Sequence, residues 1–365
     1  MIDYGHMEEN GEGVRDGARA MVKRCMDVLV LFRLKSLKIK HVKSIMAAEE
    51  QCITENNDND LIICHRYRLV HKIGNGTFGT VLLGIDLYDH SEVAMKLETK
   101  ARNNTLLHEY HIYKNFKEEI GFPKVRWCGN QGDFNILVME LLGPSLEDLF
   151  NFCSRIFSLK TVLLLADQLL SRLQALHLAG IIHRDIKPDN FAMGLGTKHN
   201  IVHLIDMGLC EKYLIPEESE VHMESEKKHS FCGTIRFASP NAHRGFALSP
   251  RDDLISLAYT LIYFLKGELP WFKYKTHSKE KYMELAGHLK NRLTVEELCD
   301  NCPEEFKTFL KYCYELKIDE TPDYGRMRQI FWMLFVKRQF ILDNMFDWNL
   351  YRYARNLEKE TDGSG

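Results

Sequence analysis

The stretch His183-Arg-Asp-Ile-Lys-Pro-Asp-Asn190 brings three chemically distinct side chains into one short segment. The Asp185 carboxylate can accept the proton of an attacking hydroxyl group, and the Lys187 ammonium can neutralise a migrating anionic group. The Asn190 side chain offers a neutral amide oxygen, which is a ligand that Mg²⁺ accepts. The spacing therefore predicts that these three residues belong to one catalytic loop.

A second acidic signal follows 16 residues after Asn190, in Asp206-Met-Gly208. It comes directly after residues 201–205, an apolar run that is typical of a buried strand. Because Mg²⁺ prefers oxygen ligands, we expect Asp206 to be its main protein ligand and Asn190 the second. Such a sparse set leaves coordination positions for nucleotide oxygens and water.

Upstream lies a glycine-rich segment, Gly74-Asn-Gly76-Thr-Phe-Gly79. In a dinucleotide-binding fold this pattern opens a helix, and an acid about 20 residues later binds ribose, a role that Glu98 could fill. However, the residues after Gly79 are typical of a strand, and Gly84 would interrupt a helix. We therefore expect a strand-loop-strand lid over the phosphates of ATP. Its backbone N–H groups would come from Gly74, Asn75, Gly76, Thr77, Phe78 and Gly79.

Lys96 ends the apolar segment Val93-Ala-Met-Lys96, and a lysine that points inward from such a strand needs a reason to be buried. The predicted reason is a positive charge on the α- and β-phosphates, held by a carboxylate from the next helix. Glu109 is the expected partner. Glu98, two residues along the same strand, is the competing candidate.

The predicted elements change type near residue 143. Strands and turns precede it, whereas residues 159–178 and about 250–266 show the i, i+3, i+4, i+7 apolar spacing of buried helices. This order predicts an α+β enzyme with two lobes, a small antiparallel sheet and a larger, mainly helical lobe, with a cleft between them.

The bulk composition limits the ligand classes and the cellular compartments that we expect for this protein. A formal charge of −3 gives no global case for nucleic-acid binding, and no apolar run approaches the roughly 18 residues that span a bilayer. The 10 cysteines are irregularly spaced, so we expect reduced thiols and a location in the cytoplasm or nucleus. Cys299 and Cys302 have C-x-x-C spacing, but no second pair lies at zinc-ligand distance along the chain.

The predicted domain covers residues 66–350, with a small lobe at 66–141, a hinge at 140–144 and a large lobe at 145–350. Residues 1–65 are an extension, acidic to residue 16 and basic from 19 to 46, in which Met46 is an alternative start. Its basic part suits either a loosely packed extension or an amphipathic helix for a membrane surface or partner. Residues 351–365 are a predicted short tail.

In this combination and order, the motifs resemble those of eukaryotic protein kinases. A lysine two residues after the catalytic aspartate is, among protein kinases, the mark of serine/threonine specificity. Over about residues 66–350 the chain is similar to the casein kinase I family. The stretches most specific to that family are Arg126-Trp-Cys-Gly129, residues 139–155, residues 158–168, Lys187-Pro-Asp-Asn-Phe191 and Phe346-Asp-Trp-Asn349.

The resemblance implies a cleft that uses ATP and Mg²⁺. Met139 is then the gatekeeper, and Glu140 to Leu142 form the hinge whose backbone hydrogen-bonds adenine. Four apolar side chains would wall the adenine slot: Ile73, Val81, Ala94 and Ile205.

The resemblance also implies a monomer that acts on proteins whose Ser or Thr is preceded by acidic or phosphorylated residues. Arg236, in Gly233-Thr-Ile-Arg-Phe237, and Lys275 match basic positions that bind such anions. Arg244 stands where the family often has Leu and would reinforce them. The alternatives are solvated surface charges or, for Arg236, a structural partner of the activation segment.

Arg184 would ordinarily seek a phosphate on the activation loop. The acids of that loop offer a substitute, so we expect activity without activating phosphorylation. These acids are Glu217, Glu218, Glu220 and Glu224. Two rival functions remain, a catalytically inactive kinase fold that scaffolds partners and a kinase of small molecules.

Overall fold

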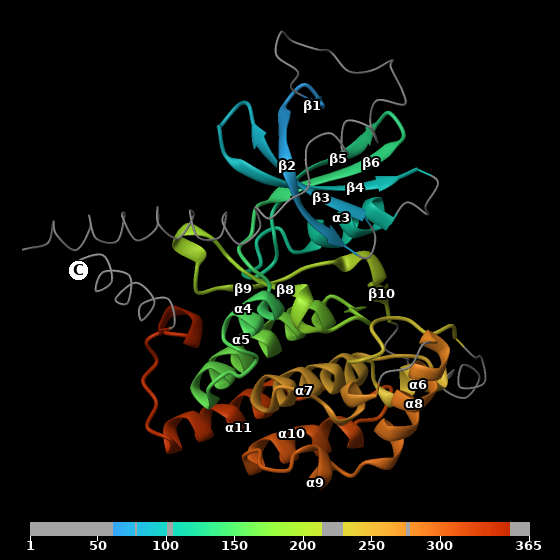
Figure 1. Cartoon of the computed structure of the whole chain (residues 1–365), viewed down its shortest axis with the longest axis vertical. Coiled ribbons are helices and arrows are strands. Elements are labelled where there is room, and N and C mark those ends of the chain that lie inside the picture. The colour runs from blue at the N-terminus through green and yellow to red at the C-terminus, as the bar shows by residue number, and fades with distance from the viewer. Residues whose placement is uncertain (1–60, 77–78, 101–104, 214–228, 275–277, 351–365) are drawn as a thin grey trace, which may run out of the picture.

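The structure, a computed structural model, describes residues 61–76, 79–100, 105–213, 229–274 and 278–350. Most of the predicted extension and the whole predicted tail lie outside these residues. Within them the chain forms two lobes, which confirms the predicted α+β architecture (Figure 1). One lobe contains the sheet β1–β6 and helix α3, and the other contains helices α4–α11.

The small lobe is built on a six-stranded antiparallel sheet with the order β1-β2-β3-β4-β6-β5. Its strands are β1 (Ile62–Ile63), β2 (Tyr67–Gly76), β3 (Gly79–Asp86), β4 (Glu92–Thr99), β5 (Val125–Gln131) and β6 (Phe134–Glu140). Alternate residues of β4, namely Val93, Met95 and Leu97, are buried in a hydrophobic core on one face of the sheet. Because β1 pairs with β2, the sheet begins at Ile62, before the predicted domain start at residue 66.

The other face of this sheet carries the residues predicted to contact the nucleotide. The register pairs Val81 of β3 with Lys96 of β4, and Ala94 of β4 with Met139 of β6. Directly opposite residues project from one face, as do residues two apart on a strand. The four side chains therefore share the face opposite the Val93 core.

Helix α3 (Thr105–Asn115) links the sheet to the large lobe. Its start is fixed by Glu98, whose carboxylate accepts hydrogen bonds from the Thr105 hydroxyl at 2.6 Å and the Leu106 backbone N–H at 3.3 Å. Leu106 and Tyr113 of α3 pack into the hydrophobic core of the large lobe rather than that of the sheet. Helix α3 thus packs between strands β5 and β6 of the sheet and the segment Met207–Leu209 of the large lobe.

The large lobe is mainly helical, with α5 and α7 packed together at its centre (Figure 1). Its helices are α4 (Leu146–Phe152), α5 (Leu159–Leu178), α6 (Pro240–Arg244), α7 (Pro250–Lys266), α8 (Lys279–Arg292), α9 (Val295–Leu298), α10 (Glu304–Glu315) and α11 (Tyr324–Lys337). α5 and α7 coincide with the predicted helices. α7 starts with a proline in its first turn and ends at Gly267, which adopts the left-handed conformation at φ 83°.

Two short antiparallel pairs hold the loops at the junction of the lobes. β7 (Ile181–Ile182) pairs with β10 (Glu211–Lys212), and β8 (Phe191–Met193) pairs with β9 (Val202–Leu204). The predicted catalytic loop runs from β7 to β8, and Asp206 follows β9. The motifs read from the sequence therefore meet at one place.

The stretch at residues 346–349 packs against the N-terminal end of α5. The Asp347 carboxylate accepts hydrogen bonds from the Ser158 backbone N–H at 2.6 Å and the Ser158 hydroxyl at 2.7 Å. The Trp348 ring centroid lies 5.4 Å from that of Phe157.

Of the described helices, none has the length and apolar character needed to cross a bilayer.

Candidate active site

The start of the catalytic loop is fixed by Asp253, a buried carboxylate in α7. It accepts hydrogen bonds from the backbone N–H groups of His183 at 2.7 Å and Arg184 at 2.8 Å, and it lies 2.8 Å from His177 Nε2. Burial acts to raise the pKa of Asp253, but the contacts with His177 and the loop outweigh it, and the pKa is lowered. A permanent negative charge in the core therefore anchors the loop.

Asp185 lies at the centre of the site. Its Oδ2 accepts a hydrogen bond from Lys187 Nζ at 2.6 Å, and Lys187 Nζ also donates to the Thr234 hydroxyl at 2.9 Å. The other carboxylate oxygen of Asp185, Oδ1, is buried and has no hydrogen-bond partner among the described residues. Because an unpaired buried acceptor is costly, this oxygen marks where a hydroxyl group from outside the chain can donate.

The β8–β9 hairpin brings Asn190 and Asp206 to one place. Its register pairs Phe191 with Leu204, and the Ile205 N–H donates to the Asn190 carbonyl at 2.9 Å. Asn190 Nδ2 donates to the Asp185 carbonyl at 2.9 Å and lies 3.3 Å from Asp185 Oδ2. The Asn190 amide oxygen accepts no hydrogen bond from any described residue. The Asp206 carboxylate and this amide oxygen form a two-ligand oxygen set, so the side chains fit Mg²⁺.

Lys96 lies between two carboxylates. Its Nζ is 2.7 Å from Glu109 Oε2 and 2.7 Å from Asp206 Oδ1, and both the lysine and Glu109 are buried. Burial acts to lower the pKa of Lys96, but the charges of Glu109 and Asp206 raise it overall. Burial raises the pKa of Glu109, whereas the pKa of Asp206 is lowered because Lys96 outweighs burial. Glu109 therefore occupies the position expected of the partner, and Glu98 serves helix α3 instead.

The glycine-rich segment is a tight hairpin between β2 and β3. The register pairs Gly74 with Val81 and Gly76 with Gly79, so the dinucleotide-binding alternative, which needs a helix here, is wrong. A Cβ atom on Gly79 would lie 2.0 Å from the Leu97 carbonyl oxygen, which requires glycine at that position. Residues 77 and 78, predicted to cover the phosphates, lie outside the described residues.

The hinge residues Glu140 and Leu142 differ in whether their backbone N–H and C=O groups are already hydrogen-bonded within the chain. The Glu140 N–H donates to the Lys124 carbonyl at 2.8 Å, and its carboxylate accepts from Lys198 Nζ at 2.9 Å. Leu142, by contrast, makes no backbone hydrogen bond to any residue of the described ranges. Its N–H and C=O are thus available to a flat ligand such as adenine. Ile73, beside Gly74, and Ile205, in the large lobe, are both half-buried.

Arg184 has a different acidic partner from those predicted. Its guanidinium forms an ion pair with Glu211 of β10 and donates to the Leu209 carbonyl at 2.7 Å. The four glutamates between residues 217 and 224 lie outside the described residues. Glu211, three residues after Gly208 in β10, is therefore the acid that meets this arginine.

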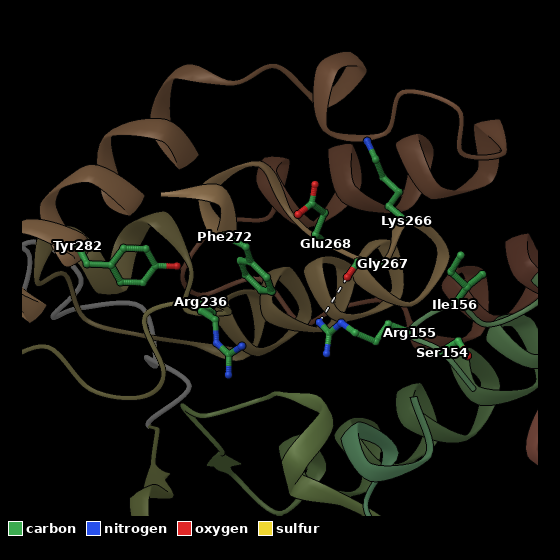
Figure 2. A pocket seen from close by; sticks show the side chains of 9 residues that line it. All are labelled: Ser154, Arg155, Ile156, Arg236, Lys266, Gly267, Glu268, Phe272 and Tyr282. Carbon is green, nitrogen blue, oxygen red and sulfur yellow. Dashed lines mark hydrogen bonds between the residues drawn. The ribbon is translucent and has the colours of Figure 1, made fainter. Parts of the chain in front are cut away.

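Arg236 lines a pocket of about 550 Å³. Its guanidinium lies 5.3 Å from the Phe272 ring centroid, and Figure 2 shows it and the Arg155 side chain approaching the pocket from two sides. Arg155 is already engaged by Glu147 at 3.3 Å. Lys275, the predicted second cation, lies outside the described residues.

Arg244 does not reinforce this pocket. It lines a separate hollow with Arg251, Lys290 and Asn291 in another part of the large lobe. The reason is that Arg244 is the last residue of α6 and contacts Asn291 near the end of α8, whereas Arg236 lies before α6 begins. The expectation that Arg244 assists Arg236 is therefore wrong.

Three residues of the site were not predicted from the sequence: Asp253, Thr234 and Glu211. Thr234 reaches Lys187 because Gly233 adopts a positive φ of 93°, where a Cβ atom would lie 2.4 Å from the Arg184 carbonyl oxygen. The glycine directly before Thr234 was a detectable signal that the backbone at this point lies close to another segment, here the catalytic loop at Arg184. Asp253 follows Arg251 and Asp252 in the first turn of α7, where acids are common, so no local sequence signal singled it out.

One comparison with known proteins bears on this arrangement. Residues 67–333, most of the chain, match the family model described as the protein kinase domain. The match begins at β2 and ends within α11, so it spans both lobes and every element that contributes to the site.

Proposed function

The chain belongs to the protein kinase family, and from that premise we propose that it is a serine/threonine kinase of the casein kinase I type. A protein kinase domain implies a phosphotransferase that uses ATP and a divalent metal, usually Mg²⁺, on protein substrates. The acceptor residue, the subfamily and the preference for acidic or phosphorylated substrates are the proposed part.

The observation that carries this proposal is the free Oδ1 of Asp185, buried beside Lys187. Bound ATP and Mg²⁺ would supply the phosphoryl group and neutralise its charge, with Lys96, Asn190 and Asp206 as the residues that hold them. Asp185 Oδ1 would orient a substrate hydroxyl group and accept its proton. Lys187 would hold the Asp185 carboxylate and offset negative charge at the reacting centre.

Two features favour a serine or threonine hydroxyl as the acceptor. Lys187 stands two residues after Asp185, as in serine/threonine kinases, and it is bound to Asp185 Oδ2 and Thr234. The hydroxyl site is therefore close to the Thr234 side chain, which suits a short acceptor side chain. The stretches at residues 139–155 and 346–349 support the casein kinase I type.

The proposed substrate preference depends on Arg236. This residue is exposed and forms no ion pair with any described residue, and its guanidinium is held over the Phe272 ring. An arginine with free donors recognises carboxylate and phosphate groups, and a phosphoserine presents more charge than an aspartate. Lys275 would add a second contact.

The test is phosphate transfer from ATP to casein in the presence of Mg²⁺. We expect phosphoserine or phosphothreonine as the product, and Asp185→Asn should lower kcat by about 10²- to 10⁴-fold while ATP binding persists. Asp189→Asn is the matched control, because Asp189 lies in the same loop but is exposed. Wild-type transfer no greater than that of Asp185→Asn would favour an inactive scaffold, and phosphotyrosine as the product would exclude the serine/threonine assignment.

A further inference from the structure

A second pocket, of about 470 Å³, opens in the large lobe between α6, α7, α8 and α10. Arg244 comes from the end of α6, Arg251 from the first turn of α7, Lys290 from the end of α8 and Tyr314 from α10. No acidic residue is among the described side chains that line it. A concave site lined by two arginines and by no carboxylate attracts anions.

Arg244 provides the exposed cation of this pocket. Its guanidinium contacts the Asn291 amide oxygen and lies 5.5 Å from the Phe246 ring centroid. Among the described residues, its contacts are this amide and this ring, and no carboxylate forms an ion pair with it. Most of its five N–H donors are therefore available to a ligand.

Arg251 provides a second, more enclosed cation. One of its terminal nitrogens donates to the Leu316 carbonyl at 3.2 Å, and its buried Nε has no hydrogen-bond partner in the described structure. The Asp252 carboxylate lies 3.7 Å from this Nε, but its oxygens accept hydrogen bonds from Ser239, Asn241 and Ser249. The charge of Arg251 is thus only partly balanced.

Lys290 forms the floor of the pocket and is less available. Its Nζ donates to the carbonyls of Ile235 at 2.6 Å and Ala238 at 2.8 Å, and it lies 3.2 Å from His243 Nε2. Burial holds the pKa of Lys290 well below its usual value. We therefore assign the contacts with an anion to the two arginines.

We propose that this pocket binds the phosphate group of a phosphorylated serine or threonine side chain on a protein partner, at a site separate from the pocket at Arg236. Two guanidinium groups with free donors match the three acceptor oxygens and the charge of about −1.5 to −2 that such a phosphate carries. The volume is within the range of ligand sites and leaves room for the side chain that bears the phosphate.

The experiment measures binding by fluorescence polarisation without ATP. The full chain carries Arg236→Ala and Lys275→Ala, so that the proposed substrate pocket does not contribute. The probe is a labelled glycine/serine peptide with one phosphoserine, compared with its unphosphorylated twin. We expect the phosphopeptide to bind at least about 10-fold more tightly, with a Kd that rises with salt.

Variants then locate the site. Arg244→Leu should raise the Kd of the phosphopeptide about 10-fold, since it removes charge-assisted hydrogen bonds. Arg292→Leu is the matched control, because Arg292 is an exposed arginine in the last turn of α8 that does not line the pocket. Arg244→Lys, which keeps the charge and loses the planar fork, should fall between them.

Two results would overturn the proposal. Equal Kd values for Arg244→Leu and Arg292→Leu would exclude Arg244 as the reader of phosphate. Competition by inorganic phosphate, with no preference for the phosphopeptide over its twin, would reduce the pocket to a site for free ions. Because no phosphoryl transfer is measured, neither result depends on the proposed kinase specificity.

Discussion

Lys96 in the cleft and Arg236 in the large lobe are both cations that we expect to meet phosphate groups, and their surroundings are opposite. Lys96 is buried and touches two carboxylates at 2.7 Å. The Arg236 side chain is exposed, and its guanidinium lies 5.3 Å from the Phe272 ring centroid without an ion pair to any described residue. One charge is held in place before any ligand arrives, and the other is left open for a ligand.

This difference predicts how each region responds to substitution. A buried charge that is already paired costs no reorganisation when the ligand binds, and its removal leaves its partners unbalanced. An exposed charge is hydrated and screened by salt, so it contributes only when a phosphate docks on it. Substitutions in the cleft should therefore affect folding and catalysis together, whereas those at Arg236 should affect only the choice of substrate.

The largest expected effect is that of Lys96→Met. It leaves Glu109 and Asp206 as neighbouring carboxylates without their cation, so phosphoryl transfer should fall about 10²- to 10³-fold. The free energy of unfolding should also fall by about 3 kcal/mol, the lower end for a broken buried pair, because Glu109 can take up a proton. Steady-state kinetics and urea unfolding measure the two losses. Lys100→Met, an exposed lysine just after β4, is the control.

The pH dependence of the unfolding free energy sharpens this prediction. Burial already raises the pKa of Glu109, and the loss of Lys96 raises it further. A carboxyl group with a raised folded-state pKa stabilises the protein at low pH and loses that effect as pH rises. The variant should therefore lose stability relative to wild type from about pH 5 upward. Adding Glu109→Gln should recover stability but not activity, and a pH-independent difference would contradict this account.

A smaller effect is expected from the double change Arg236→Ala with Lys275→Ala. The wild-type enzyme should prefer peptides with phosphoserine three residues before the acceptor over alanine-bearing peptides by about 10- to 100-fold in kcat/KM. The double change should remove this preference and leave unprimed peptides unaffected. An undiminished preference would mean that other residues read the phosphate, with Arg155 as the next candidate.

The smallest effect is expected at the ion pair of Arg184 with Glu211. Both side chains are partly exposed, so Glu211→Gln should lower kcat by at most about 5-fold. Phosphatase-treated wild-type enzyme should keep its rate, because Glu211 already supplies the negative charge. Lys212→Gln, next to it in β10, is the control. A large loss on phosphatase treatment, restored by an upstream kinase, would show that Arg184 needs a phosphate.

Short-range sequence patterns predicted much of this molecule. The glycines of the β2–β3 hairpin, the loop from residue 183 to 190, and helices α5 and α7 each depend on neighbours within a few residues. In each of these cases, the residues that determine the local structure lie within the pattern itself, so the sequence predicted that structure. The sequence left Glu98 as a competitor of Glu109, and the structure separates them, because Glu109 lies 2.7 Å from Lys96 and Glu98 bonds the start of α3.

Long-range contacts could not be read in the same way. Asp253 meets the catalytic loop from 70 residues away in the sequence, and nothing near Arg184 specifies Glu211 rather than a later acid. Arg244 was misplaced because its distance along the chain from Arg236 says nothing about the direction in which α6 runs. These positions depend on how helices pack, which a single sequence does not encode locally.

The anchoring of the catalytic loop by Asp253 has a consequence for amide hydrogen exchange. The N–H groups of His183 and Arg184 are bonded to a carboxylate in one of the most buried helices of the large lobe. Their protons can reach solvent only when the loop separates from α7, which requires opening of that core rather than local fraying. The loop that carries Asp185 should therefore exchange as slowly as the centre of the lobe, although it borders the cleft.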